Sequence, residues 1–134
     1  MDGIVEQFSR RLLRASLVTP VMLCIHLVAL GVFCLVGIRI VQQYLVIFKE
    51  REAAISPITL SLFKLSTWLG HFWYLLVLAV ILLNGPLLFA LHLQPRNRRW
   101  MASAWFVAVV VAFLLGTGFI GFVLTHQFDS LENG

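Results

Sequence analysis

Residues 56–92 read SPITLSLFKLSTWLGHFWYLLVLAVILLNGPLLFALH. Ser56 and Pro57 are typical of a helix N-cap followed by proline at the first helical position. No residue after them is expected to break the helix before Gly85-Pro86, where Pro86 predicts a bend. At 1.5 Å per residue such a helix extends to about 55 Å, whereas the hydrocarbon core of a bilayer is about 30 Å thick. The stretch therefore predicts one long helix that crosses a membrane and continues beyond it.

The long helix has two parts of different composition. Its first part, residues 57–70, places four apolar side chains on one face: Ile58, Leu62, Leu65 and Leu69. The polar side chains of this part lie mainly on other faces, and they are Thr59, Lys64, Ser66 and Thr67. Such a distribution is typical of a partly hydrated helix. From His71 onward the pattern is apolar all round. Aromatic residues gather where the two parts meet, as in an interfacial belt: Trp68, Phe72, Trp73 and Tyr74.

The composition identifies an integral membrane protein. Of 134 residues, 60% are hydrophobic and only 12% are charged, which is too apolar for an ordinary soluble domain. The sequence predicts an all-α fold with three transmembrane helices in a single domain. Its expected parts are an amphipathic lead (1–16), span 1 (about 17–41), the long helix with span 2 (57–93), span 3 (101–126) and an acidic tail (127–134). Little sequence remains for a folded water-soluble active site.

The net charge of +4 is explained by basic residues that flank the spans. Two groups are expected at the membrane surface: Arg10, Arg11 and Arg14 in the lead, and Arg96, Arg98 and Arg99 in the second connection. Because cytoplasmic loops carry an excess of Lys and Arg, the N-terminus is expected inside and the C-terminus outside. The lead is either an interfacial helix on an anionic leaflet or an unstructured terminus. The expected partner is the lipid bilayer, and nucleic acid is not expected.

Small residues recur every four positions in the third span: Ala104, Ala108, Ala112 and Gly116. This spacing lets two helix backbones approach closely in lipid. We call these four residues the small-residue ladder. It predicts packing against a helix of this chain, of another membrane subunit or of a second copy.

Two polar residues fall inside apolar spans, His26 in the first and Asn84 in the second. Counted from the inner ends of their spans at 1.5 Å per residue, both lie about 12–14 Å deep. A lone polar group in hydrocarbon is costly unless it finds a partner. The sequence therefore predicts that His26 and Asn84 face each other, form a hydrogen bond and set the register of the two helices.

No catalytic or metal-binding motif occurs, so neither enzymatic activity nor a cofactor is expected. Cys24 and Cys34 both lie in the first span without metal-ligand spacing. His71 and His126 both lie near the expected outer surface, and they are the one histidine pair whose depths suit a shared haem. A membrane anchor of a redox complex that binds haem near these two residues therefore stays open as an alternative function.

Residues 44–76 also carry a pattern of aromatic and hydroxyl residues around the first turn. An aromatic pair four apart precedes the turn at Ile55-Ser56-Pro57, and Thr59, Ser66 and Trp73 then follow at intervals of seven. The motif residues are Tyr44, Phe48, Thr59, Ser66 and Trp73. This stretch, about a quarter of the chain, resembles a transmembrane hairpin of the inner-membrane platform proteins of type II secretion and type IV pilus assembly. The family's usual glycine before the turn is Glu52 here, and its usual proline ahead of the aromatic pair is Gln42.

The resemblance implies a hairpin whose loop lies outside the cytoplasm and a role in envelope assembly. It implies localisation in the bacterial inner membrane. The function expected from the sequence is accordingly a small non-enzymatic membrane scaffold or assembly subunit.

Overall fold

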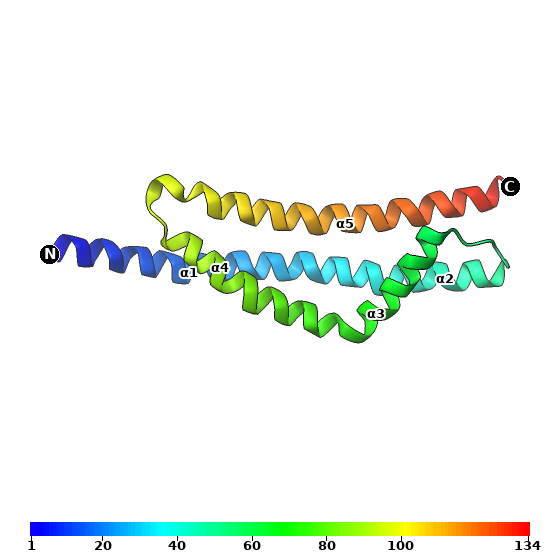
Figure 1. The fold of residues 1–134 in the computed structure, drawn as a ribbon, viewed down its shortest axis with the longest axis horizontal. Coiled ribbons are helices and arrows are strands. Elements are labelled where there is room, and N and C mark those ends of the chain that lie inside the picture. Colours follow the sequence, from blue (N-terminus) through cyan, green and yellow to red (C-terminus); the bar gives the residue numbers. More distant parts are fainter. The chain divides into compact units, whose positions relative to one another are not determined.

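A computed structural model describes residues 1–134, and every element in it is a helix. The order along the chain is α1 (Asp2–Leu35), the π-helix η1 (Val36–Ile40), α2 (Val41–Glu50), α3 (Pro57–Ala79), the π-helix η2 (Val80–Asn84), α4 (Gly85–Leu93), the 3₁₀-helix η3 (Arg96–Arg98) and α5 (Trp100–Glu132) (Figure 1). Adjoining elements make three helices long and apolar enough to cross a membrane: Asp2–Glu50, Pro57–Leu93 and Arg96–Glu132. The predicted all-α fold with three helices long and apolar enough to span a membrane is confirmed.

The helix boundaries follow from local sequence signals. Ser56 caps α3, because its Oγ accepts a hydrogen bond from the backbone N–H of Thr59 at 3.3 Å, and Pro57 is the first helical residue. At the other end α4 stops at Leu93, and Pro95 has an extended backbone with ψ of 157°. The helix that begins in α1 continues through α2 to Glu50 and then turns. These ends lie where the capping residue and the prolines predict them.

The prediction of an unbroken second helix is wrong at Phe72. This residue has φ of −119° and ψ of 17°, outside the helical range, so α3 is kinked there. Two local features explain the kink. The carbonyl of Thr67 accepts a hydrogen bond of 2.8 Å from Nδ1 of His71, and Gly70, a poor helix former, stands two residues before the break. Kinks are commonly caused by glycines and by side chains that hydrogen-bond to the helix backbone.

At the position of the predicted bend, near Pro86, the structure has a π-helical segment, η2, that ends at Asn84. Proline cannot donate a hydrogen bond to the carbonyl four residues earlier, and its ring crowds that turn. A wider π turn immediately before it accommodates the ring without ending the helix. The second π segment, η1, joins α1 to α2 and has no comparable signal in the sequence.

The chain packs as two compact units, and each contains part of all three long helices. The first unit comprises Met1–Ala29 and Leu75–Val111, and the second comprises Leu30–Tyr74 and Ala112–Gly134. In the first unit the interior is lined by small, polar and leucine side chains: Ala15, Thr19, His26, Asn84, Leu88 and Ala102.

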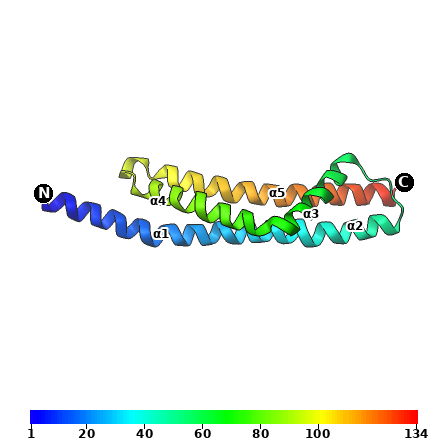
Figure 2. The same cartoon turned by 60° about the horizontal axis from the view of Figure 1, so that its bottom comes forward.

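The second unit has the larger apolar core. Figure 2 shows the first part of α3 beside α2 and the last part of α5. The three elements bury one cluster of aliphatic and aromatic side chains: Val41, Phe48, Leu62, Phe63, Ile120 and Leu124. Three-helix packing around this cluster holds the turn between α2 and α3.

The packed face of α3 differs from the predicted apolar face. Leu62 and Leu69 are buried as expected, but Ile58 and Leu65 are 61% and 46% exposed. In their place the buried face includes hydroxyl side chains, because distant segments supply their hydrogen-bond partners. The polar part of this face consists of Thr59 and Ser66, at 0% and 2% exposure.

Candidate functional site

A polar cluster joins three helices inside the first unit. His26 of α1 and Asn84 at the end of η2 are 0% and 8% exposed, and their side chains are hydrogen-bonded through Nδ1 of His26 and Nδ2 of Asn84. Nε1 of Trp105 on α5 donates to Oδ1 of Asn84 at 2.7 Å. Nε2 of His26 lies 3.2 Å from the carbonyl oxygen of Phe106. The structure thus brings together the two residues that the depth count paired and adds α5 to them.

The direction of each hydrogen bond in the cluster follows from Trp105. An indole N–H can only donate, so the oxygen of Asn84 must face it. The amide nitrogen of Asn84 then donates to Nδ1 of His26, which must accept. Nε2 of His26 therefore carries the hydrogen and donates to the carbonyl of Phe106, as a neutral imidazole does.

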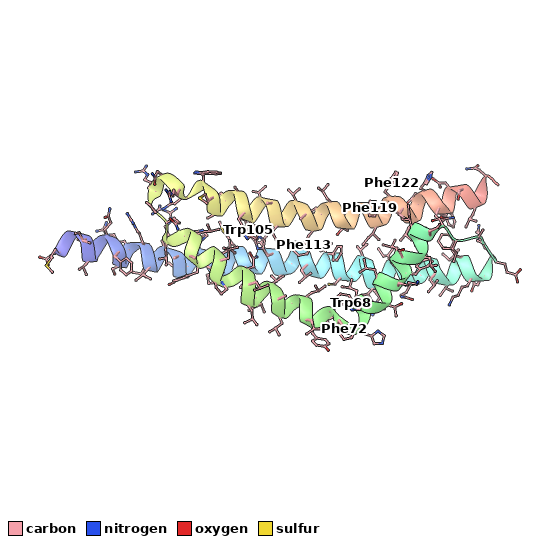
Figure 3. The ribbon with its side chains drawn as sticks, viewed as in Figure 1. Trp68, Phe72, Trp105, Phe113, Phe119 and Phe122 are labelled. Atoms are coloured by element: carbon pink, nitrogen blue, oxygen red, sulfur yellow. The ribbon has the colours of Figure 1, made fainter.

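The imidazole of His26 has no free hydrogen-bonding group. Both ring nitrogens of His26 are engaged, and the ring stacks on Phe106 with centroids 5.1 Å apart and planes at 21°. No lone pair on the imidazole is free for a metal or a haem iron. What the cluster can do is hold α1, η2 and α5 at one level, since each bond links a different pair of helices. In Figure 3 Trp105 points from α5 toward the other two.

The sequence did not predict the part played by Trp105 and Phe106. An indole N–H buried in hydrocarbon needs an acceptor as much as Asn84 needs partners. Trp105 lies five residues inside the start of α5, at a depth its long side chain can bridge. Five residues correspond to only about 7.5 Å of helical rise, so a count of matching depths would not have paired Trp105 with Asn84.

A second polar set ties the α2–α3 turn to α5 within the second unit. Oγ1 of Thr59 donates to Oε1 of Gln127 at 3.2 Å, and Nε2 of Gln127 donates to the carbonyl of Ala54 at 3.4 Å. Nε2 of Gln42 donates to Oγ of Ser66 at 3.1 Å. The buried hydroxyls of α3 are therefore bonded to α2 and α5.

The motif residues of the resemblance all lie in the second unit, but in different environments. The rings of Tyr44 and Phe48 are 6.1 Å apart, and Phe48 also contacts Phe63 at 6.1 Å in the core. Thr59 and Ser66 belong to the polar set just described. Trp73 is 50% exposed and contacts only the adjacent ring of Tyr74 among the aromatic residues. Four of the five thus stabilise the packing around the turn.

The small-residue ladder is split between two environments. Gly116 faces Phe33, and a Cβ at this glycine would meet Phe33 Cε2 at 3.1 Å. Ala104, Ala108 and Ala112 are exposed. Four residues rotate about 40° more than one full turn of an α-helix. Over three intervals of four residues the ladder therefore moves away from the packed face of α5.

His71 and His126 are not brought together. His71 bonds the carbonyl of its own helix, and the ring of His126 stacks on Phe122 with centroids 6.0 Å apart. Both side chains are exposed. In Figure 3 Phe72, next to His71, and Phe122, one turn before His126, point away from each other.

No protein-family model matches this sequence, and neither the curated proteins nor the solved structures include a match.

Proposed function

We propose that the chain is a small non-enzymatic scaffold or assembly subunit of a membrane complex, and that α5 docks another membrane helix. The observation that carries this proposal is the exposure of Ala104, Ala108 and Ala112 in the first half of an apolar helix. In lipid, helices associate through close backbone approach and hydrogen bonds, and small residues four apart permit that approach. The chain's own helices use only Gly116 of the ladder.

The hydrogen bonds between the helices support the same proposal. His26, Asn84 and Trp105 bond to one another in the first unit, and Thr59 bonds to Gln127 in the second. Such contacts build a rigid support. The docking helix would come from a different membrane subunit or from a second copy of the chain.

The setting that we propose is a secretion-like or pilus-like envelope machine in a bacterial inner membrane. The resemblance around the α2–α3 turn supports it, and the arginines near Arg14 and Arg99 support an N-terminus inside and a C-terminus outside. A cysteine introduced as Ser130→Cys should then react with a membrane-impermeant thiol reagent in intact cells, whereas Asn97→Cys should not. The reverse labelling pattern would overturn this orientation.

Larger side chains on the exposed part of the ladder test the proposed docking face. The double variant Ala108→Leu/Ala112→Leu should lose its co-purifying partner or its oligomeric state in mild detergent, as measured by light scattering on a sizing column. Its thermal stability should stay unchanged, because neither alanine is buried. Ala90→Leu, at an exposed alanine of α4, is the matched control and should assemble normally. Normal assembly of the double variant would refute a packing role for this face.

An absorbance spectrum of the purified complex tests the alternative of a haem anchor. We expect no band near the Soret region that shifts on reduction. Such a band, lost in the variant His126→Leu, would favour the redox function over the scaffold.

A further inference from the structure

The arginines of the first unit gather at one end of it. They come from two segments far apart in the sequence, the start of α1 and the connection between α4 and α5: Arg10, Arg11 and Arg14, and Arg96, Arg98 and Arg99. Figures 1 and 2 both show this connection beside the first third of α1. We call these six residues the arginine cluster.

The arginine cluster has almost no balancing charge. The first unit contains just two acidic residues, Asp2 and Glu6. One ion pair forms in the chain, between Arg10 and Glu6 at 2.5 Å, and both of its side chains are largely exposed. Five arginines are therefore left without an acidic partner. Guanidinium groups at the edge of a low-dielectric region repel one another unless an anion lies among them.

The burial of two of these arginines indicates where an anion would stabilise the structure most. Arg11 and Arg99 are half-buried, and Nε of Arg99 is buried without a hydrogen-bond partner. A buried, charged donor that lacks an acceptor is costly. Arg99 also directly precedes α5, and the first N–H groups of a helix lack partners and carry partial positive charge.

Exposed apolar side chains flank these arginines in the sequence. Leu13 and Leu17 of α1 are 61% and 68% exposed, and Trp100 at the start of α5 is 69% exposed. Exposed leucines suit acyl chains, and an exposed tryptophan suits the boundary between headgroups and acyl chains. A ligand that satisfies both parts carries a phosphate at one end and hydrocarbon at the other.

We propose that the arginine cluster is a binding site for anionic phospholipid, and that a lipid with two phosphates is preferred. Arginine binds phosphate oxygens through two parallel N–H donors, which gives the contact both strength and geometry. Because the arginines come from two segments, one phosphate binds at the α4–α5 connection and the second binds at α1. Basic pockets between transmembrane helices bind such headgroups in this way.

The test uses the whole protein in a non-ionic detergent and native mass spectrometry of retained lipid. Diphosphatidylglycerol, phosphatidylglycerol and phosphatidylcholine are titrated separately. We expect the strongest retention for the first and the weakest for the last. The double variant Arg98→Gln/Arg99→Gln should weaken retention of diphosphatidylglycerol by about fivefold for each arginine removed. The matched control, Arg39→Gln/Lys49→Gln, removes two positive charges from the second unit and should retain the lipid normally.

Three outcomes would overturn the proposal. The first is equal retention of the zwitterionic and anionic lipids, and the second is an equal loss of lipid retention in both double variants. The third is displacement of the lipid by inorganic phosphate at a concentration similar to that of the lipid, which would indicate a site for soluble anions. The ladder variants with leucine at Ala108 and Ala112 should keep full lipid retention. Failure of lipid binding is therefore distinguishable from failure of helix docking.

Discussion

Replacing Asn84 with leucine should loosen two helix contacts at once. Its side chain bonds His26 of α1 and Trp105 of α5, so Asn84→Leu removes both bonds. His26→Leu also removes two bonds, one to Asn84 and one to the carbonyl of Phe106. The two variants share one bond, and the double variant removes three in all.

Hydrogen bonds within membranes average about 0.6 kcal/mol and reach about 1.7 kcal/mol in double-mutant cycles. Each single variant should therefore cost about 1.2 kcal/mol of unfolding free energy, and the double variant about 1.8 kcal/mol. The shared bond then appears as a coupling of about 0.6 kcal/mol. Trp105→Phe, which removes one bond to Asn84, should couple to Asn84→Leu by a similar amount. It should be nearly additive with His26→Leu, because no hydrogen bond joins those two side chains.

The assay is reversible unfolding in mixed micelles, with helix content followed by circular dichroism. Thr117→Val is the control, since the hydroxyl of Thr117 bonds only the carbonyl of Phe113 in its own helix, at 2.9 Å. Its effect should stay within about 0.5 kcal/mol. Strictly additive losses for His26 and Asn84 would refute the shared bond. Equal coupling of Trp105 to both residues would refute the assignment of its hydrogen bond to Asn84 alone.

Two further perturbations test the second unit, and both are measured as shifts in the unfolding midpoint. Gly37→Leu should lower the free energy of unfolding by about 1–3 kcal/mol through overpacking, because a Cβ at Gly37 would already meet Leu69 Cδ2 at 2.8 Å. Gly31→Leu is the control and should be tolerated, because a Cβ at Gly31 would have nothing within 4 Å. Thr59→Val should cost about 1–2 kcal/mol, because the fully buried hydroxyl bonds both the α3 N-cap and α5. Thr125→Val, whose hydroxyl bonds only its own helix at 2.8 Å, is its control. A tolerated Gly37→Leu or a neutral Thr59→Val would contradict the packing described for that site.

The sequence by itself determined the helices and the level of their polar residues. Ser56, Pro57 and Pro95 act within one helical turn, so the helix ends they mark do not depend on tertiary contacts. The depth of His26 and Asn84 follows from a constant rise per residue. Two polar groups at one depth in neighbouring spans have few partners other than each other.

Only the tertiary structure decided which helix faces are covered. A periodic pattern shows which side chains share a face, but the partner's geometry decides whether that face is packed. Thr59 was expected in water and is buried, because Gln127, nearly seventy residues later in the chain, supplies its acceptor. Gly116 packs on Phe33 while Ala104 stays exposed, because an interval of four residues drifts around the helix. Trp105 completes the polar cluster because α5 brings its indole to Asn84, a contact between segments that no local signal contains.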